Sequence, residues 1–195
     1  MKKISFLTLA LAFTLAACKK EKKQETPASA DVQEQVEEVK EVKEEIKKIK
    51  VALAAKSGSD VTGNAVFTDE NGTVTMVAVF EGLTEGEHAI HLHEKADCSA
   101  DDGTSTGGHW NPTAQPHGKW GDAQGYHKGD IGNFNADANG NGTITFKTNE
   151  WCIGCGDPNK DILGKAVIVH QGVDDFTSQP TGAAGGRVSC GGIIE

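Results

Sequence analysis

The chain has 195 residues, of which 37% are hydrophobic, 24% charged and 6% aromatic, and 24 are glycines. This composition supports a folded core and favours a turn-rich β protein over a helix bundle. The formal net charge of −9 argues against a large basic surface for nucleic acid, and no apolar run is long enough for a polytopic membrane protein.

The beginning of the chain has the pattern of an export signal. Lys2 and Lys3 precede an apolar stretch over residues 4–15, which two alanines separate from Cys18. We expect a signal peptide over residues 1–17.

The sequence Leu-Ala-Ala-Cys that ends at Cys18 resembles a bacterial lipobox. The resemblance implies cleavage before Cys18 and lipid on its thiol and amine, and more than one acyl chain gives a stable membrane anchor. It implies a bacterial cell-envelope protein that contacts the lipid membrane through Cys18 and faces the periplasm or the cell exterior. An ordinary signal peptide with an incidental cysteine is the alternative.

Residues 18–47 are expected to be a linker and a charged helical spacer that lifts the following domain off the membrane. Residues 18–50 contain nine lysines and nine acidic residues, and apolar side chains recur among them at three- and four-residue steps. A short coiled-coil seam is the alternative. The first strand can begin near Ile49, and we place the domain at residues 48–195. The apolar positions are Val32, Val36, Val39, Val42, Ile46 and Ile49.

The domain has the pattern of an antiparallel β protein. Residues 73–80, 143–148 and 165–170 are rich in β-forming residues, and Asn-Gly pairs at Asn71 and Asn139 are typical of hairpin turns. Short strands at this spacing favour a sandwich or a barrel. Between residues 94 and 131 there is no periodicity, and so long a loop needs a metal or a disulfide to order it.

All seven histidines lie between His88 and His170, in a domain whose residues 51–195 carry a net charge of −11. His91 and His93 are two apart in a strand-like run, so we expect them to point to one side while Ile90 and Leu92 enter the core. Further histidines follow in the long loop, with Asp130 close behind. Imidazole with carboxylate suits zinc, and an all-imidazole set suits copper or zinc.

Five motifs together resemble the copper-zinc superoxide dismutase family over about three quarters of the chain. The resemblance implies an all-β fold, an eight-stranded Greek-key β-barrel of immunoglobulin-like sandwich type with long metal-ordered loops. It also implies conversion of superoxide to oxygen and hydrogen peroxide in antioxidant defence of the envelope. The motifs are Gly-Leu-Thr-Glu-Gly with His-Ala-Ile-His-Leu-His-Glu (82–94), Gly-His-Trp-Asn-Pro (108–112), His-Lys-Gly-Asp-Ile-Gly-Asn (127–133), Val-Ile-Val-His (167–170) and Gly-Gly-Arg-Val-Ser-Cys-Gly (185–191).

The resemblance also implies one copper and one zinc per subunit, with His109 as a bridge between them that takes part in catalysis. His88 matches a structural histidine that is not a ligand. The implied copper ligands are His91, His93, His109 and His170. The implied zinc ligands are His109, His117, His127 and Asp130.

Four further roles follow from the same resemblance. Asp174 matches a carboxylate that links His91 to His117, and Cys98 and Cys190 match the family's disulfide. Arg187, the only arginine of the chain, matches a residue that attracts superoxide beside the copper. Thr181 matches the residue that narrows the channel with that arginine.

Cys152 and Cys155 are not part of the family's pattern. A CxxC pair can be a redox pair, a metal clamp or a small disulfide loop. In an exported domain we expect the disulfide.

The sequence leaves open the strength of electrostatic guidance, the choice between an enzyme and a metal-binding protein, and the oligomeric state. Residues 175–187 contain no lysine or glutamate, so the charged guidance residues of many family members are missing. The alternative to the enzyme is a non-catalytic lipoprotein that binds or delivers copper and zinc. The family dimerises in more than one way, which leaves both a homodimer and a monomer open.

Overall fold

The computed structural model describes residues 46–195, which form eight strands and one short 3-10 helix, η1 (Thr104–Thr106). Among these residues no helix is long and apolar enough to cross a membrane. The strands are β1 (Lys47–Ala55), β2 (Thr62–Glu70), β3 (Thr73–Glu81), β4 (Gly86–His93), β5 (Asp130–Ala136), β6 (Gly142–Thr148), β7 (Ala166–His170) and β8 (Arg187–Gly192).

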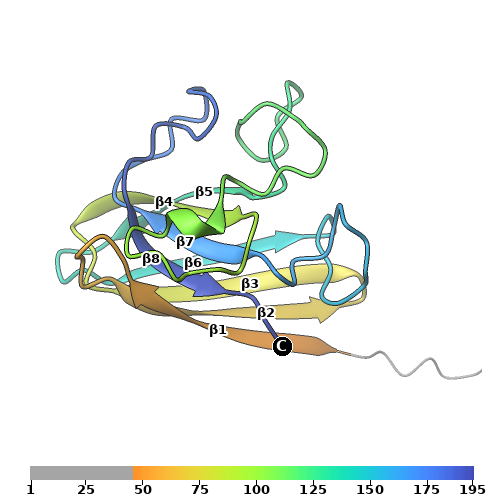
Figure 1. Ribbon diagram of the computed structural model, residues 1–195, viewed down its shortest axis with the longest axis horizontal. Coiled ribbons are helices and arrows are strands. Elements are labelled where there is room, and N and C mark those ends of the chain that lie inside the picture. The colour runs from red at the N-terminus through yellow and green to blue at the C-terminus, as the bar shows by residue number, and fades with distance from the viewer. Residues whose placement is uncertain (1–45) are drawn as a thin grey trace, which may run out of the picture. The chain divides into compact units, whose positions relative to one another are not determined.

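The strands close into a barrel in the order β1-β2-β3-β6-β5-β4-β7-β8, and every neighbouring pair is antiparallel (Figure 1). The β3–β4 and β6–β7 connections join strands that are not neighbours in the barrel, which is the Greek-key arrangement. The predicted all-β barrel is therefore confirmed.

Alternation of apolar and polar residues makes these segments strands. In β3, Val74, Met76, Ala78 and Phe80 are buried and the residues between them are polar or exposed. By contrast, β4 is buried on both sides from His88 to His93, because loops cover its outer face.

The predicted hairpins are present at both Asn-Gly positions. Asn71 and Gly72 have φ angles of 54° and 71° in the turn between β2 and β3, as an Asn-Gly hairpin requires. In the β5–β6 turn, the Asp137 carboxylate accepts hydrogen bonds from the backbone N–H groups of Asn139 and Asn141, both at 2.9 Å.

The first strand, expected near Ile49, begins two residues earlier, at Lys47. Residues 47–50 belong to β1, where Ile49, Val51 and Leu53 point to the barrel interior at two-residue steps. Pairing with β2 and β8 decides the conformation here. The signal peptide, Cys18 and the rest of the spacer lie outside the described residues.

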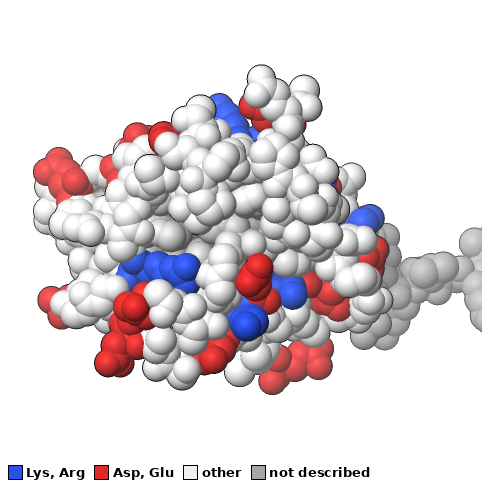
Figure 2. Space-filling view, turned by 45° about the horizontal axis from the view of Figure 1, so that its top comes forward, with Lys and Arg blue, Asp and Glu red and all other residues white. Residues whose placement is uncertain are grey.

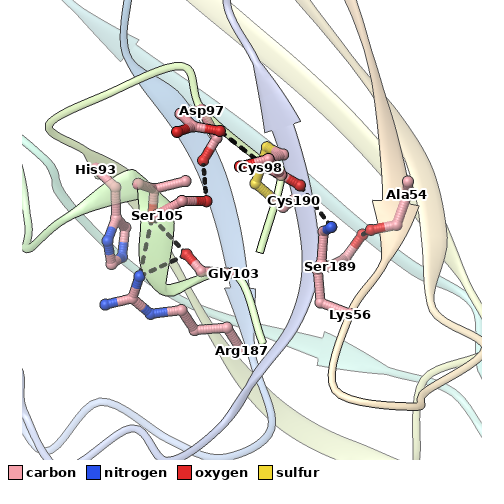
Figure 3. Close-up of a disulfide and its surroundings, with 12 residues drawn as sticks. Ala54, Lys56, His93, Asp97, Cys98, Gly103, Ser105, Arg187, Ser189 and Cys190 are labelled. Atoms are coloured by element: carbon pink, nitrogen blue, oxygen red, sulfur yellow. Dashed lines mark hydrogen bonds between the residues drawn. A yellow bond between two sulfur atoms is a disulfide. The ribbon is translucent and has the colours of Figure 1, made fainter. Parts of the chain in front are cut away.

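Two long loops carry several of the predicted site residues and rise from the same side of the barrel in Figure 1, residues 94–129 in green and 171–186 in dark blue. The Cys98–Cys190 disulfide attaches the first loop to β8, with Cα atoms 5.9 Å apart (Figure 3). Farther along the same loop, the Trp120 ring lies 4.8 Å from that of Phe146 and 5.8 Å from that of Trp151. The loop is thus attached to the barrel at two separate places.

Candidate metal centre

Strand β4 brings two histidines to the outer face of the barrel, as the two-residue spacing predicts. His91 and His93 are fully buried under the loops, whereas Ile90 and Leu92 belong to the core. His109 lies in the 94–129 loop and forms an isolated β-bridge with His93, which brings its ring next to β4. His170 is the last residue of β7, the neighbour of β4.

These four histidines form a group that we call the imidazole cluster. One ring nitrogen of each lies within 4.8 Å of those of the others, and all four side chains are buried. An all-imidazole donor set of this kind suits copper or zinc. The members are His91, His93, His109 and His170.

Hydrogen bonds decide which nitrogen of each ring points into the imidazole cluster. His93 Nδ1 donates to the carbonyl oxygen of Gly107 at 3.0 Å, and His170 Nδ1 donates to that of Gly185 at 3.2 Å. Because a carbonyl can only accept, both rings carry their proton on Nδ1 and keep the Nε2 lone pair free.

Three rings of the cluster, those of His93, His109 and His170, are held neutral. Burial, together with the neighbouring ring of His109, keeps the pKa of His93 well below its usual value. Burial and the proximity of His91 lower the pKa of His109 to about 4 and that of His170 to about 3. Neutral imidazoles are the form that binds a metal cation.

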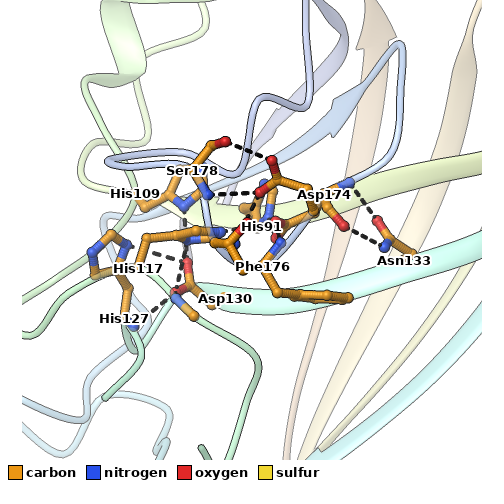
Figure 4. Close-up of polar contacts among 12 residues, drawn as sticks. His91, His109, His117, His127, Asp130, Asn133, Asp174, Phe176 and Ser178 are labelled. Atoms are coloured by element: carbon orange, nitrogen blue, oxygen red, sulfur yellow. Dashed lines mark hydrogen bonds and ion pairs between the residues drawn. The ribbon is translucent and has the colours of Figure 1, made fainter. Parts of the chain in front are cut away.

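A second group, the mixed cluster, adjoins the first and shares His109 with it. Asp130, the first residue of β5, lies at its centre. Its carboxylate oxygens are 2.8 Å from His109 Nδ1, 3.0 Å from His117 Nδ1 and 3.2 Å from His127 Nδ1 (Figure 4). Three imidazoles and one carboxylate are typical zinc ligands. The members are His109, His117, His127 and Asp130.

Charge in the mixed cluster is concentrated on Asp130 and His117. Burial opposes ionisation of Asp130, but the surrounding imidazoles, His109 first, hold its pKa far below the usual range. Burial also disfavours protonated His117, yet Asp130 and Asp174 raise the pKa of His117 to about 9. A cation at this cluster would replace that proton as the partner of the carboxylate.

Asp174 joins the two clusters by a pair of hydrogen bonds. One carboxylate oxygen accepts from His91 Nε2 at 2.9 Å and the other from His117 Nε2 at 2.8 Å (Figure 4). Burial raises the pKa of Asp174, but these two imidazoles outweigh it and the pKa lies well below the usual value. The anionic carboxylate therefore orients one ring of each cluster and fixes its tautomer.

The residues fit two metal ions, as their unsatisfied atoms show. Within residues 46–195, six buried ring nitrogens make no hydrogen bond, and two of them, His117 Nδ1 and His127 Nδ1, face the Asp130 carboxylate at ion-pair distance only. Such atoms are costly to bury and need an explanation, and cations provide one. They are His91 Nδ1, His93 Nε2, His109 Nε2, His117 Nδ1, His127 Nδ1 and His170 Nε2.

His88 is the exception among the seven histidines. Its Nδ1 lies 3.0 Å from the carbonyl oxygen of His170, and its Nε2 lies 2.8 Å from that of Thr84. Both nitrogens are engaged, which agrees with its expected role as a structural residue.

Arg187 begins β8 and its guanidinium is held by the 94–129 loop. Nη1 donates to the carbonyl oxygen of Gly103 at 2.7 Å and to Thr106 Oγ1 at 2.9 Å, and Nη2 donates to the carbonyl oxygen of Gly107 at 2.8 Å (Figure 3). Burial lowers the pKa of Arg187, and nearby Asp102 opposes this shift. Two of the five N–H groups stay available for an anion.

Some residues that hold the site were not assigned a role from the sequence. Asn133 pairs with the backbone of Asp174 through two hydrogen bonds of 2.9 Å, and Gln179 pairs in the same way with His117, at 2.9 and 2.8 Å. Both contacts join residues more than 40 positions apart, so no local pattern reveals them.

The remaining predicted positions are the four cysteines of the domain and Thr181. Cys98 is bonded to Cys190 and Cys152 to Cys155, so both expected disulfides are present. Thr181 is half-buried in the 171–186 loop, and its role in narrowing a channel stays a prediction.

The comparison with known proteins agrees with this arrangement. The family profile of copper/zinc superoxide dismutase matches residues 61–193. A SOD-like protein from Bacillus subtilis is similar in structure, with a TM-score of 0.66 and 27% identity, over 74% of this chain and 97% of that one. A double mutant of a SOD-like protein from that organism is 29% identical, with a TM-score of 0.66, over 75% and 97% of the two chains.

A third similar structure is that of the clock protein EA4, which is 34% identical with a TM-score of 0.64, over 75% of this chain and 94% of that one. The family profile spans most of the barrel, from the end of the β1–β2 connection past β8, and includes every member of both clusters. The chain therefore belongs to the copper/zinc superoxide dismutase family.

Proposed function

We propose that the protein converts superoxide to oxygen and hydrogen peroxide, with one copper ion in the imidazole cluster and one zinc ion in the mixed cluster. The observation that carries this proposal is the set of six buried ring nitrogens that make no hydrogen bond within residues 46–195 and face the two clusters. Copper supplies one-electron exchange when bound, which zinc cannot do.

The histidine shared by both clusters has a role in proton handling. His109 Nδ1 faces Asp130 in the mixed cluster, while Nε2 faces the imidazole cluster. His109 Nε2 is therefore the atom that can hold a proton between the two half-reactions and release it to peroxide. Asp174 keeps the neighbouring rings of His91 and His117 in place during this exchange.

Arg187 provides positive charge for an anionic substrate in a strongly acidic domain. Residues 51–195 carry a net charge of −11, and Figure 2 shows acidic side chains in several patches on the visible face with lysine and arginine in a few separate places. A fixed guanidinium beside His93 gives a local positive potential and two free donors for superoxide. A protein that only stores metal needs no such group.

The test is the dismutation rate of the full chain, with copper and zinc measured on the same sample. We expect activity to follow the copper content. His170→Ala should lose copper and activity together, whereas Lys165→Ala, which removes another cation near the loops, should keep both. Full metal loading without activity would instead support the storage or delivery alternative.

We also propose that the enzyme is lipid-anchored through Cys18 in a bacterial cell envelope, where it meets superoxide formed outside the cytoplasm. The support is the signal pattern before Cys18. A labelled fatty acid should be incorporated into the intact chain but not into Cys18→Ala, which should appear in the soluble fraction. Equal labelling of both proteins would exclude the anchor at this residue.

A further inference from the structure

We propose that Cys152, Cys155 and Asp161 form a third cation site, which is closed while the two cysteines form a disulfide and opens on reduction. In the reduced form two thiolates and one carboxylate would bind a thiophilic cation of the zinc or copper(I) class. The site lies in the 149–165 loop between β6 and β7, drawn in blue at the right of Figure 1. It does not depend on superoxide chemistry.

The three side chains already converge. One ligand atom of each lies within 4.8 Å of those of the other two. Cys155 is exposed, and Cys152 and Asp161 are half-buried, so both a reductant and a cation can reach the group from solvent. Two thiolates and a carboxylate leave one coordination position for water in a tetrahedral site.

The disulfide is not what holds the loop in shape. Cys152 N–H donates to the carbonyl oxygen of Lys160 at 2.9 Å, and Ile162 N–H donates to that of Cys152 at 3.1 Å. Trp151, Ile153 and Ile162 are almost fully buried and attach the loop to the barrel core. Opening the S–S bond therefore leaves the two sulfurs close to each other.

Asp161 is fixed independently of the sulfurs. Its Oδ1 accepts backbone hydrogen bonds from Gly154 at 3.0 Å and Leu163 at 3.1 Å, and its Oδ2 accepts one from Gly156 at 2.8 Å. Because each carboxylate oxygen has two acceptor positions, Oδ2 keeps one for a cation. The same backbone contacts stabilise the segment that carries Cys155.

The redox step is a thiol–disulfide exchange with a dithiol reductant, either a small dithiol or a dithiol protein. Its thiolate attacks exposed Cys155 Sγ, the Cys152–Cys155 bond breaks, and Cys152 leaves as a thiolate. The second thiol of the reductant then resolves the mixed disulfide and releases Cys155. The reductant loses two electrons and two protons and becomes a disulfide, and the protein gains two thiols, whose protons are released when the cation binds.

The second disulfide should not react under the same conditions. Cys190 is 1% exposed and Cys98 packs against the small buried cluster around it. Access to a sulfur limits the rate of exchange. A mild dithiol should therefore open the Cys152–Cys155 bond first.

The experiment uses the full chain with Cys18→Ser, so that no other thiol interferes, and Co²⁺ as the probe. After mild reduction we expect two free thiols per chain, binding of one more Co²⁺ than the disulfide form, and a thiolate-to-cobalt charge-transfer band in the near ultraviolet. Imidazole and carboxylate ligands do not produce this band, so the two histidine clusters cannot mimic it.

Two variants make the test specific. Cys152→Ser with Cys155→Ser should lose the band, and Asp161→Asn should weaken Co²⁺ binding by about tenfold or more, since even residues that only support a ligand are worth that much. A reduced pair without the band, a band that persists in the double serine variant, or earlier opening of the Cys98–Cys190 bond would overturn the proposal. Unchanged affinity in Asp161→Asn would remove the carboxylate from the site.

Discussion

Arg187 and His93 share one hydrogen-bond acceptor, the carbonyl oxygen of Gly107. Arg187 Nη2 donates to it at 2.8 Å and His93 Nδ1 at 3.0 Å. One peptide group thus determines both the position of the guanidinium and the tautomer of a ring in the imidazole cluster. The charge proposed to attract the substrate and the proposed copper ligand are thereby held at a fixed spacing.

Replacement of Arg187 should separate substrate attraction from metal binding. In Arg187→Ala we expect the dismutation rate to fall by about tenfold or more, because a fixed positive charge raises encounter rates with an anion by this order. Copper and zinc contents should stay unchanged, since Arg187 is in neither cluster. Arg187→Lys should retain part of the rate. Loss of metal in Arg187→Ala would assign the residue a structural role instead.

Asp174→Asn should weaken zinc binding although it preserves size. The amide can accept from only one of the two imidazole N–H groups of His91 and His117 and presents its own N–H₂ to the other. Such support is worth about 10- to 100-fold in metal affinity, which a chelator competition measures. Asp175→Asn is the matched control, because the Asp175 side chain is exposed and accepts hydrogen bonds only from Thr177 and Ser178. Equal affinities would contradict the role of Asp174.

Gly182→Ala should displace the Asp174 carboxylate from its hydrogen bonds with His91 and His117. Gly182 has φ +65°, and a Cβ there would overlap Asp174 Oδ1 and come within 2.6 Å of His117 Nε2. Gly164→Ala is the control, because Gly164 has φ +78° but a Cβ there meets no atom of residues 46–195 within 4 Å.

Both alanine variants should lose about 1–2 kcal/mol of unfolding free energy from the left-handed backbone. Only Gly182→Ala should also lose zinc affinity, as judged by the same chelator competition. If Gly164→Ala lost zinc equally, backbone strain alone would explain the effect.

The two disulfides should differ in their effect on stability. The Cys98–Cys190 bond joins residues 92 positions apart and the Cys152–Cys155 bond residues only 3 apart. A longer closed loop removes more chain entropy from the unfolded state, so Cys98→Ser with Cys190→Ser should cost about 2–5 kcal/mol in urea unfolding. Loss of the shorter bond should cost clearly less. Equal losses would show that chain entropy does not decide the difference.

The rate should depend only weakly on ionic strength. Residues 175–187 contain no lysine or glutamate, so long-range guidance comes mainly from Arg187. We expect a change below about threefold between low and physiological salt, where steered association falls steeply. A steep decline that persists in Arg187→Ala would point to charged residues elsewhere.

Local rules predict only part of the centre, whereas the full ligand sets and the roles of Asp174 and Arg187 were implied by the family resemblance. His91 and His93 are two residues apart, and they alternate with the apolar residues Ile90 and Leu92. This pattern is enough to place the two imidazoles on one face of a strand. The Asn-Gly pairs likewise predict their own turns. In contrast, β2 and β8 carry no clear alternation, and they are strands because the closing barrel supplies a neighbour on each side.

At the start of β1, a helical and a strand-like spacing of apolar residues overlap. Ile46 and Ile49 continue a three-residue step from the charged segment, while Ile49, Val51 and Leu53 begin a two-residue step. Seven consecutive pairs with β2 favour the second. The roles of Asn133 and Gln179 were beyond prediction because their partners, Asp174 and His117, lie in loops distant in the sequence.

The attachment of the 94–129 loop also determines what its fluorescence reports. All three tryptophans of the chain belong to this loop or contact it: Trp110 and Trp120 lie within it, and Trp151 donates Nε1–H to the carbonyl oxygen of Lys128 at 2.8 Å. Their emission therefore responds to the packing of this loop on the barrel core as well as to the core itself. The protein carries its own optical probe of a segment whose order the proposed activity requires.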